Sequence, residues 1–199
     1  MIRLYSGTPG SGKSYHIAAD LVQGLTESGK LYIANFPITQ PKHSHGNFLY
    51  VDNVELMPSK LVEISQRWFL NHKFGEGQIV LYLDECQLLF NAREWQKTGR
   101  DTWLSFFTQH RKYGYDIILV AQFDRMVDRQ IRSLIEEEQL HRKLSNVGWQ
   151  GKVANAVMGG HMFARVIYYY PLHERCCPPG CSPEPDRACD GPQEYGTYP

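Results

Sequence analysis

The sequence predicts an α/β domain in three layers, with a mainly parallel central sheet between layers of helices. Two apolar runs, "IVLYL" at 79–83 and "IILVA" at 117–121, are uninterrupted, which is typical of parallel strands buried on both faces. Segments with helical spacing of apolar residues alternate with strand-like segments along most of the chain. Near the C-terminal edge, where fewer helices intervene, we expect antiparallel strands to extend the sheet.

The first elements frame a glycine-rich loop. Residues 2–6 predict a strand that runs into the loop, and 14–29 predict an amphipathic helix that leaves it. The other segments with strand character are 30–38, 48–56, 79–85, 116–123, 139–145 and 163–172. The other segments with helical character are 59–74, 102–114 and 125–138.

Composition changes near residue 174, where Pro, Gly and Cys become frequent and periodicity ends. We therefore expect one domain at 1–173 and a flexible tail at 174–199. Four cysteines of the tail lie close together, with two histidines upstream: Cys176, Cys177, Cys181, Cys189, His161 and His173. Zinc binding, disulfides and an unstructured tail all stay open, and the many prolines favour the last.

The overall charge is balanced. Lys and Arg together number 21, as do Asp and Glu, so the chain lacks the basic footprint of a protein that coats nucleic acid. No stretch approaches the roughly 18 uninterrupted apolar residues of a membrane helix, and the N-terminus lacks a secretory signal. We expect a cytoplasmic protein that contacts a membrane only through a segment outside these 199 residues.

The glycine-rich loop fits the pattern G-x-x-x-x-G-K-[ST], and the strand before it and helix after it are the required context. Its backbone N–H groups and the helix N-terminus converge on one anion site. Lys13 is expected to reach the β- and γ-phosphates, and the Ser14 hydroxyl to ligate Mg²⁺. The predicted nucleotide-binding residues are Gly7, Thr8, Pro9, Gly10, Ser11, Gly12, Lys13 and Ser14.

Two carboxylates follow the apolar strand at 79–83. Asp84 is the candidate second Mg²⁺ ligand. Glu85 is the candidate that accepts a proton from, or orients, a water attacking the γ-phosphate. Because an enzyme that transfers phosphate to a substrate hydroxyl gains nothing from activating water, this pair favours an NTP hydrolase over a kinase.

Two further side chains are candidates for the chemistry. Gln122 stands where the apolar run 117–121 ends, and we expect it to hold the attacking water or to sense the γ-phosphate. Arg111 lies near the end of the predicted helix 102–114 and is a candidate arginine finger for a neighbouring subunit. Three other arginines are rivals for that role: Arg125, Arg129 and Arg132.

Three blocks together carry a family resemblance: "LYSGTPGSGKSYH", "IVLYLDECQLLFNAR" and "FFTQHRKYGYDIILVAQFDRMVDRQIRSLIEE". Over roughly residues 1–170 the chain resembles the zonular occludens toxin (Zot) family, which includes the gene I proteins of filamentous phages. The resemblance places the family roles on the residues already chosen: Gly7, Gly12, Lys13, Ser14, Asp84, Glu85 and Gln122.

The resemblance implies an ATPase related to the FtsK and HerA DNA-pumping motors, with ATP and Mg²⁺ as cofactors. It implies a homo-oligomeric ring at the cytoplasmic face of the host inner membrane. The implied partners are phage single-stranded DNA and the phage coat and export proteins. The resulting hypothesis is an Mg²⁺-dependent ATPase that powers packaging or extrusion of filamentous-phage DNA. A small-molecule or nucleotide kinase and a nucleotide-gated scaffold without useful turnover are the alternatives.

Overall fold

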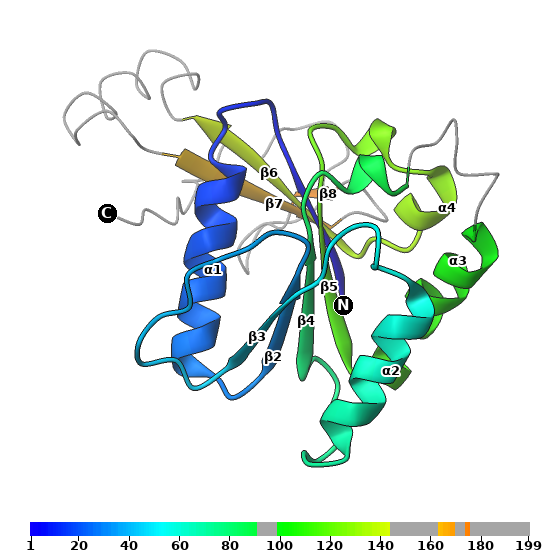
Figure 1. Ribbon diagram of the computed structural model, residues 1–199. Coiled ribbons are helices and arrows are strands. Elements are labelled where there is room, and N and C mark those ends of the chain that lie inside the picture. Colours follow the sequence, from blue (N-terminus) through cyan, green and yellow to red (C-terminus); the bar gives the residue numbers. More distant parts are fainter. Residues whose placement is uncertain (91–98, 144–162, 170–173, 176–199) are drawn as a thin grey trace.

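A computed structural model of the chain describes residues 1–90, 99–143, 163–169 and 174–175. In this part of the chain the strands form one eight-stranded sheet in the order β3-β2-β4-β5-β1-β6-β7-β8 (Figure 1). The strands are β1 (Ile2–Ser6), β2 (Leu31–Ala34), β3 (Asn47–Tyr50), β4 (Ile79–Leu83), β5 (Tyr115–Val120), β6 (Glu137–Lys143), β7 (Phe163–Tyr169) and β8 (Glu174–Arg175). The α-helices are α1 (Lys13–Glu27), α2 (Pro58–Phe69), α3 (Arg100–Gln109) and α4 (Arg129–Arg132), with short 3₁₀ turns at Cys86–Leu88, His110–Tyr113 and Asp124–Met126.

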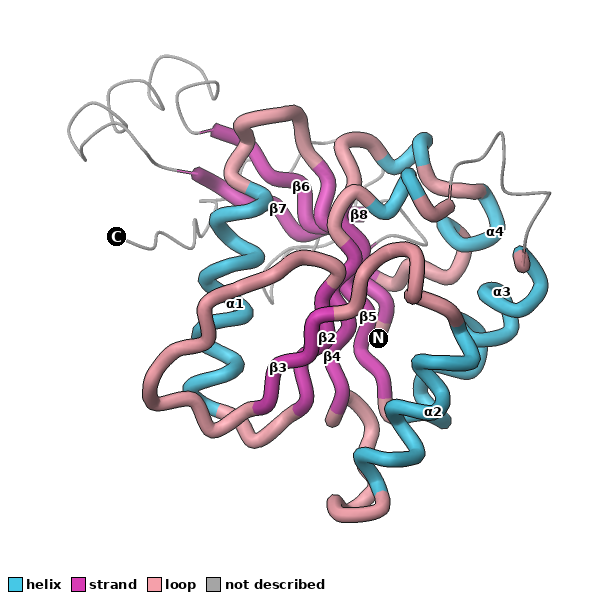
Figure 2. The backbone as a smooth tube through the Cα atoms, viewed as in Figure 1, coloured by secondary structure: helices cyan, strands magenta, loops and turns pink. Residues whose placement is uncertain are grey.

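The predicted fold class is confirmed. All pairings from β3 across to β6 are parallel, and β7 and β8 add antiparallel strands at one edge. Helix α1 covers one face of the sheet, and α2, α3 and α4 lie on the other side (Figures 1 and 2). Each interface is a separate apolar core: Ile17, Leu21 and Leu25 of α1 pack in one, and Leu61, Phe106 and Phe107 pack in the other.

The order of strands decides where the functional residues meet. Strand β5 lies between β1 and β4, and its residues contribute to both apolar cores. Since β1, β4 and β5 run parallel, their carboxyl ends share one edge of the sheet. The glycine loop, Asp84 and Gln122 each follow one of these three ends.

Two expectations for the later strands were wrong. The segment 125–138 is not one helix, because α4 spans only Arg129–Arg132 and Glu137 already belongs to β6. Strand β6 is also not an antiparallel addition, since it pairs parallel to β1 with Ser6 opposite Leu140. The run of three glutamates favours helix locally, but pairing with β1 and an Arg3–Glu137 contact of 3.7 Å override that preference.

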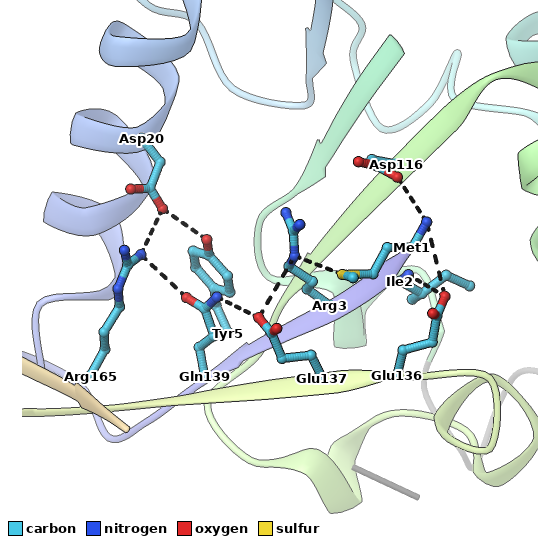
Figure 3. A network of polar contacts seen from close by, with 10 residues as sticks. All are labelled: Met1, Ile2, Arg3, Tyr5, Asp20, Asp116, Glu136, Glu137, Gln139 and Arg165. Atoms are coloured by element: carbon cyan, nitrogen blue, oxygen red, sulfur yellow. Dashed lines mark hydrogen bonds and ion pairs between the residues drawn. The ribbon is translucent and has the colours of Figure 1, made fainter. Parts of the chain in front are cut away.

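A polar network joins α1 to the edge of the sheet (Figure 3). The Asp20 carboxylate accepts hydrogen bonds from the Tyr5 hydroxyl at 2.8 Å and from Arg165 of β7 at 3.0 Å. Arg165 also donates to Gln139 of β6 at 3.3 Å. These contacts hold β7, the first antiparallel strand, against the middle of α1.

The sheet continues to Arg175 through the pairing of β8 with β7. The four tail cysteines, His161 and His173 lie outside the described residues, so the flexible tail and its chemistry stay predictions. Of the helices that the structure describes, none has both the length and the apolar character needed to span a bilayer.

Candidate nucleotide-binding and hydrolysis site

The glycine loop joins β1 to α1 with three glycines at positive φ, Gly7, Gly10 and Gly12. At two of them a side chain has no room: a Cβ on Gly7 would lie 2.5 Å from the carbonyl oxygen of His141, and one on Gly12 2.3 Å from the Phe163 ring. Helix α1 has no acidic residue in its first turn and no side-chain cap. Its N-terminal N–H groups are therefore available to an anion.

Lys13 lies at the start of α1 and reaches back over the loop. Its Nζ donates hydrogen bonds to the carbonyl oxygens of Gly7 at 2.5 Å and Thr8 at 3.3 Å. Partial burial lowers the pKa of Lys13, while the charges of Glu85 and Asp84 act in the opposite direction. The loop lysine and both candidate carboxylates thus lie close enough to interact.

Asp84 is held by an asparagine that the sequence reasoning missed. Asn35 follows β2, accepts a hydrogen bond from the Asp84 N–H at 2.8 Å and donates one to the Asp84 carbonyl at 2.8 Å. The Asn35 side-chain amide also donates to Asn53 at 2.9 Å. Burial raises the pKa of Asp84, and a hydrogen bond from the Glu85 N–H opposes that rise. The carboxylate is therefore fixed in direction and poorly solvated, which suits a ligand for a cation.

Glu85 has an unusual backbone. Its φ is 48°, and no other non-glycine residue in the described part of the chain has a positive φ. The side chain is exposed and accepts a hydrogen bond from the amide of Gln87, a buried residue of the following 3₁₀ turn. Backbone strain of this kind is typical of functional positions, because it directs a side chain that regular structure would point elsewhere.

The side chains near the glycine loop suit an Mg²⁺ ion that is held partly by the protein and partly by the phosphates of a nucleotide. The described residues contain no cluster of three or more His, Cys, Asp or Glu side chains that would hold a metal by themselves. Mg²⁺ is usually held by one or two protein oxygens together with phosphate oxygens and water. Ser14, exposed in the first turn of α1, and the fixed carboxylate of Asp84 supply that small donor set.

The structure treats the two remaining candidates differently. Gln122 lies at the site, because its carbonyl accepts a hydrogen bond from the Gly7 N–H at 3.2 Å. Arg111 lies at the amino ends of the strands, on the side of the sheet opposite the site, and its guanidinium pairs with the Glu136 carboxylate at 2.8 Å. It takes no part in the site of its own chain, and a role in a neighbouring subunit stays a prediction. Among its rivals, Arg125 and Arg129 are exposed, and Arg132 pairs with Asp124.

Two buried histidines contact the backbone of the glycine loop and of the residue before it, and nothing in the sequence pattern indicated them. The Nδ1 of His16 lies 3.1 Å from the Gly12 carbonyl, and that of His141 lies 3.2 Å from the Ser6 carbonyl. The two rings are 4.8 Å apart, centroid to centroid. These contacts engage the backbone carbonyl just before the loop and one near its end, and so help to hold the loop in place.

His141 should make the fold acid-sensitive. Burial, followed by the neighbouring His16, lowers the pKa of His141 to about 4, and its Nε2 has no partner in the described part of the chain. Between pH 6.5 and about 4 the His141 imidazole is protonated in the unfolded chain but neutral in the folded chain. As the pH is lowered through this window, the free energy of unfolding should therefore decrease by about 1.4 kcal/mol per pH unit.

Urea unfolding at pH 7, 6 and 5 measures this slope. We expect His141→Leu to have a smaller slope than the wild type, and His72→Gln, a change at an exposed histidine, to keep the wild-type slope. An unchanged slope in His141→Leu would contradict the assignment.

Comparisons with known proteins agree with the resemblance seen in the sequence. The family model described as "Zonular occludens toxin (Zot)" matches residues 1–170. The gene 1 protein of Enterobacteria phage fd is 35% identical over 167 residues, which cover 79% of this chain and 47% of the phage protein. The chain thus spans about half the length of this relative.

Two solved structures share the fold. The N-terminal domain of zonular occludens toxin from Neisseria meningitidis superposes with a TM-score of 0.53 at 17% identity, covering 85% of this chain and 83% of that chain. B204, the DNA-packaging ATPase of Sulfolobus turreted icosahedral virus, gives a TM-score of 0.57 at 16% identity, covering 86% and 93%. At this level of identity the comparison establishes a shared α/β fold.

Proposed function

This chain belongs to the zonular occludens toxin (Zot) family, and from that premise we propose that it is an Mg²⁺-dependent ATPase that powers packaging or extrusion of phage DNA during virion assembly. The observation that carries the proposal is that the glycine loop, Asp84 and Gln122 follow the carboxyl ends of the parallel neighbours β1, β4 and β5, with Glu85 directly after Asp84. A second carboxylate that activates water would be of little benefit to a kinase, which would lose ATP by it, so this arrangement favours hydrolysis.

Each residue has a distinct task in this reaction. The loop N–H groups and Lys13 bind the β- and γ-phosphates of ATP and offset their charge. Ser14 and Asp84 would hold Mg²⁺, and the bound ion would neutralise charge that develops on the phosphate oxygens. Glu85 orients the attacking water and takes its proton, and the Gln122 side chain senses the γ-phosphate.

The relatives support a proposal for the biological setting. The gene 1 relatives are phage proteins, and B204 is a DNA-packaging ATPase. We place this chain in a homo-oligomeric ring at the cytoplasmic face of the host inner membrane, where it acts on phage single-stranded DNA together with coat and export proteins. In such a ring Arg111, which is half-exposed, would reach a neighbouring subunit's nucleotide after leaving Glu136.

Phosphate release by the purified chain tests the proposal. We expect release to require Mg²⁺, to stop when EDTA is added, and to increase several-fold with single-stranded DNA. Phosphate transfer to an added acceptor without release to water would instead identify a kinase. Tight ATP binding with no release under any condition would identify a scaffold.

A further inference from the structure

A hollow of about 400 Å³ lies beside the glycine loop, at the carboxyl ends of β1, β5 and β6. We call it the loop hollow. The residues of its lining that bear on its chemistry are Thr8, Gln122, Phe123, Asp124, Arg142 and Lys143. No part of the proposed hydrolysis mechanism uses Phe123, Arg142 or Lys143, so their presence beside the nucleotide site needs another explanation.

In the loop hollow the acidic side chains are engaged by other groups, whereas, among the residues that the structure describes, the two basic side chains are not. Its acidic groups are engaged, since Asp124 pairs with Arg132 at 3.6 Å and Glu138 accepts a hydrogen bond from the Ser6 hydroxyl at 2.5 Å. Arg142 and Lys143 form no ion pair within the described part of the chain. Two cations at the end of β6 are therefore available to an anion that enters the hollow.

One wall of the loop hollow is an exposed aromatic ring. Phe123 follows Gln122 directly and is 52% exposed. A phenylalanine ring this accessible, next to two available cations, matches the pairing that binds single-stranded nucleic acid, in which a base stacks on an aromatic side chain and the backbone phosphate meets a basic one. The chemistry of the hollow thus fits one nucleotide unit.

The loop hollow is continuous with the nucleotide site. Thr8 of the glycine loop lines it, and the Gly7 N–H donates to the carbonyl of Gln122, the residue before Phe123. A ligand stacked on Phe123 would therefore lie one residue away from the predicted γ-phosphate sensor. That position would let occupancy of the hollow affect the nucleotide site.

We propose that the loop hollow binds one nucleotide unit of a single-stranded nucleic acid, with its base on Phe123 and its phosphate on Arg142 and Lys143. The proposal rests on the ATPase function given above and assigns the strand contact to one place on the chain. The same chemistry would suit the base and sugar of the bound ATP itself. The experiment therefore distinguishes a nucleotide of a nucleic-acid strand from ATP as the ligand of the hollow.

The test measures fluorescence anisotropy of a labelled oligo(dT) with the full 199-residue chain, in the presence of Mg²⁺ and a non-hydrolysable ATP analogue. Phe123→Ala should weaken oligonucleotide binding about tenfold. Arg142→Gln with Lys143→Gln should reduce the slope of log affinity against log salt concentration by about 0.7, because the contact with one phosphate is lost.

Matched controls lie at the opposite edge of the sheet. Phe74 is 53% exposed, like Phe123, and Lys73 and Lys112 are exposed lysines. We expect Phe74→Ala and the double change Lys73→Gln with Lys112→Gln to bind oligo(dT) as the wild type does. Circular dichroism melting of each variant shows that the fold is retained.

The affinity for a fluorescent ATP analogue decides whether the loop hollow binds a nucleic-acid strand or ATP. Wild-type ATP affinity in the Phe123 and Arg142/Lys143 variants, together with weakened oligo(dT) binding, supports the proposal. Unchanged oligo(dT) binding in both variants overturns it, as does a loss of ATP affinity instead. Because none of these readouts needs turnover, a chain that fails to hydrolyse ATP gives a separate result.

Discussion

Replacing Glu85 with Gln should reduce phosphate release about 10²- to 10⁴-fold and leave the affinity for ATP within about threefold of the wild-type value. Glutamine has nearly the same shape and keeps a polar contact with Gln87, but its amide cannot accept a proton from water. Steady-state phosphate release and titration with a fluorescent ATP analogue measure the two quantities. Glu63→Gln, a change at an exposed residue of helix α2, is the matched control and should hydrolyse ATP at the wild-type rate.

The backbone of Glu85 provides an independent check on that prediction. A non-glycine residue in the left-handed region costs about 1–2 kcal/mol, so Glu85→Gly should remove strain as well as the carboxylate. We expect this variant to lose hydrolysis as Glu85→Gln does, with a free energy of unfolding at least equal to that of the wild type. Hydrolysis that survives both changes would assign the proton transfer to another group.

The candidate site residues that the structure brings together share one property, which is their place just after the end of a strand. Uninterrupted apolar runs identified β4 and β5 as buried parallel strands, and the carboxyl ends of parallel strands meet at one edge. The meeting of the glycine loop, Asp84 and Gln122 follows from those two facts. Asn35 obeys the same rule, since it follows β2, and a search for polar residues after every strand would have found it.

What the sequence could not predict depends on pairing between distant segments. His141 lies in the middle of β6 and reaches the loop only because β6 pairs with β1 over a separation of more than 130 residues. The position of Arg111 depends on topology as well: a helix that joins two parallel strands returns the chain to the edge where strands begin. Arg111 lies in the 3₁₀ turn that follows α3, and therefore at the end of the sheet opposite the nucleotide site.

Replacing Lys13 with Ala should raise the dissociation constant for ATP by more than 10²-fold. A lysine that binds two phosphates forms two charge-assisted hydrogen bonds of about 1.5–3 kcal/mol each, and about 1.4 kcal/mol corresponds to a factor of ten. The ammonium group is already partly desolvated, because burial lowers its pKa, so its attraction for phosphate is screened less than that of a surface lysine. Titration with a fluorescent ATP analogue measures the change, and Lys73→Ala, at an exposed position, should bind ATP like the wild type.

Thermal unfolding separates loss of binding from loss of structure in the Lys13 variant. The contacts that Lys13 makes with Gly7 and Thr8 tie only the loop, so without nucleotide both chains should unfold at similar temperatures. At a nucleotide concentration one hundred times its dissociation constant the wild type gains about 2.7 kcal/mol, whereas the variant should gain almost nothing. A Lys13→Ala chain that ATP and Mg²⁺ stabilise as much as the wild type would show that the anion is held by the loop N–H groups alone. The lysine would then belong to catalysis, and the loss would appear in the rate of phosphate release instead of in the affinity.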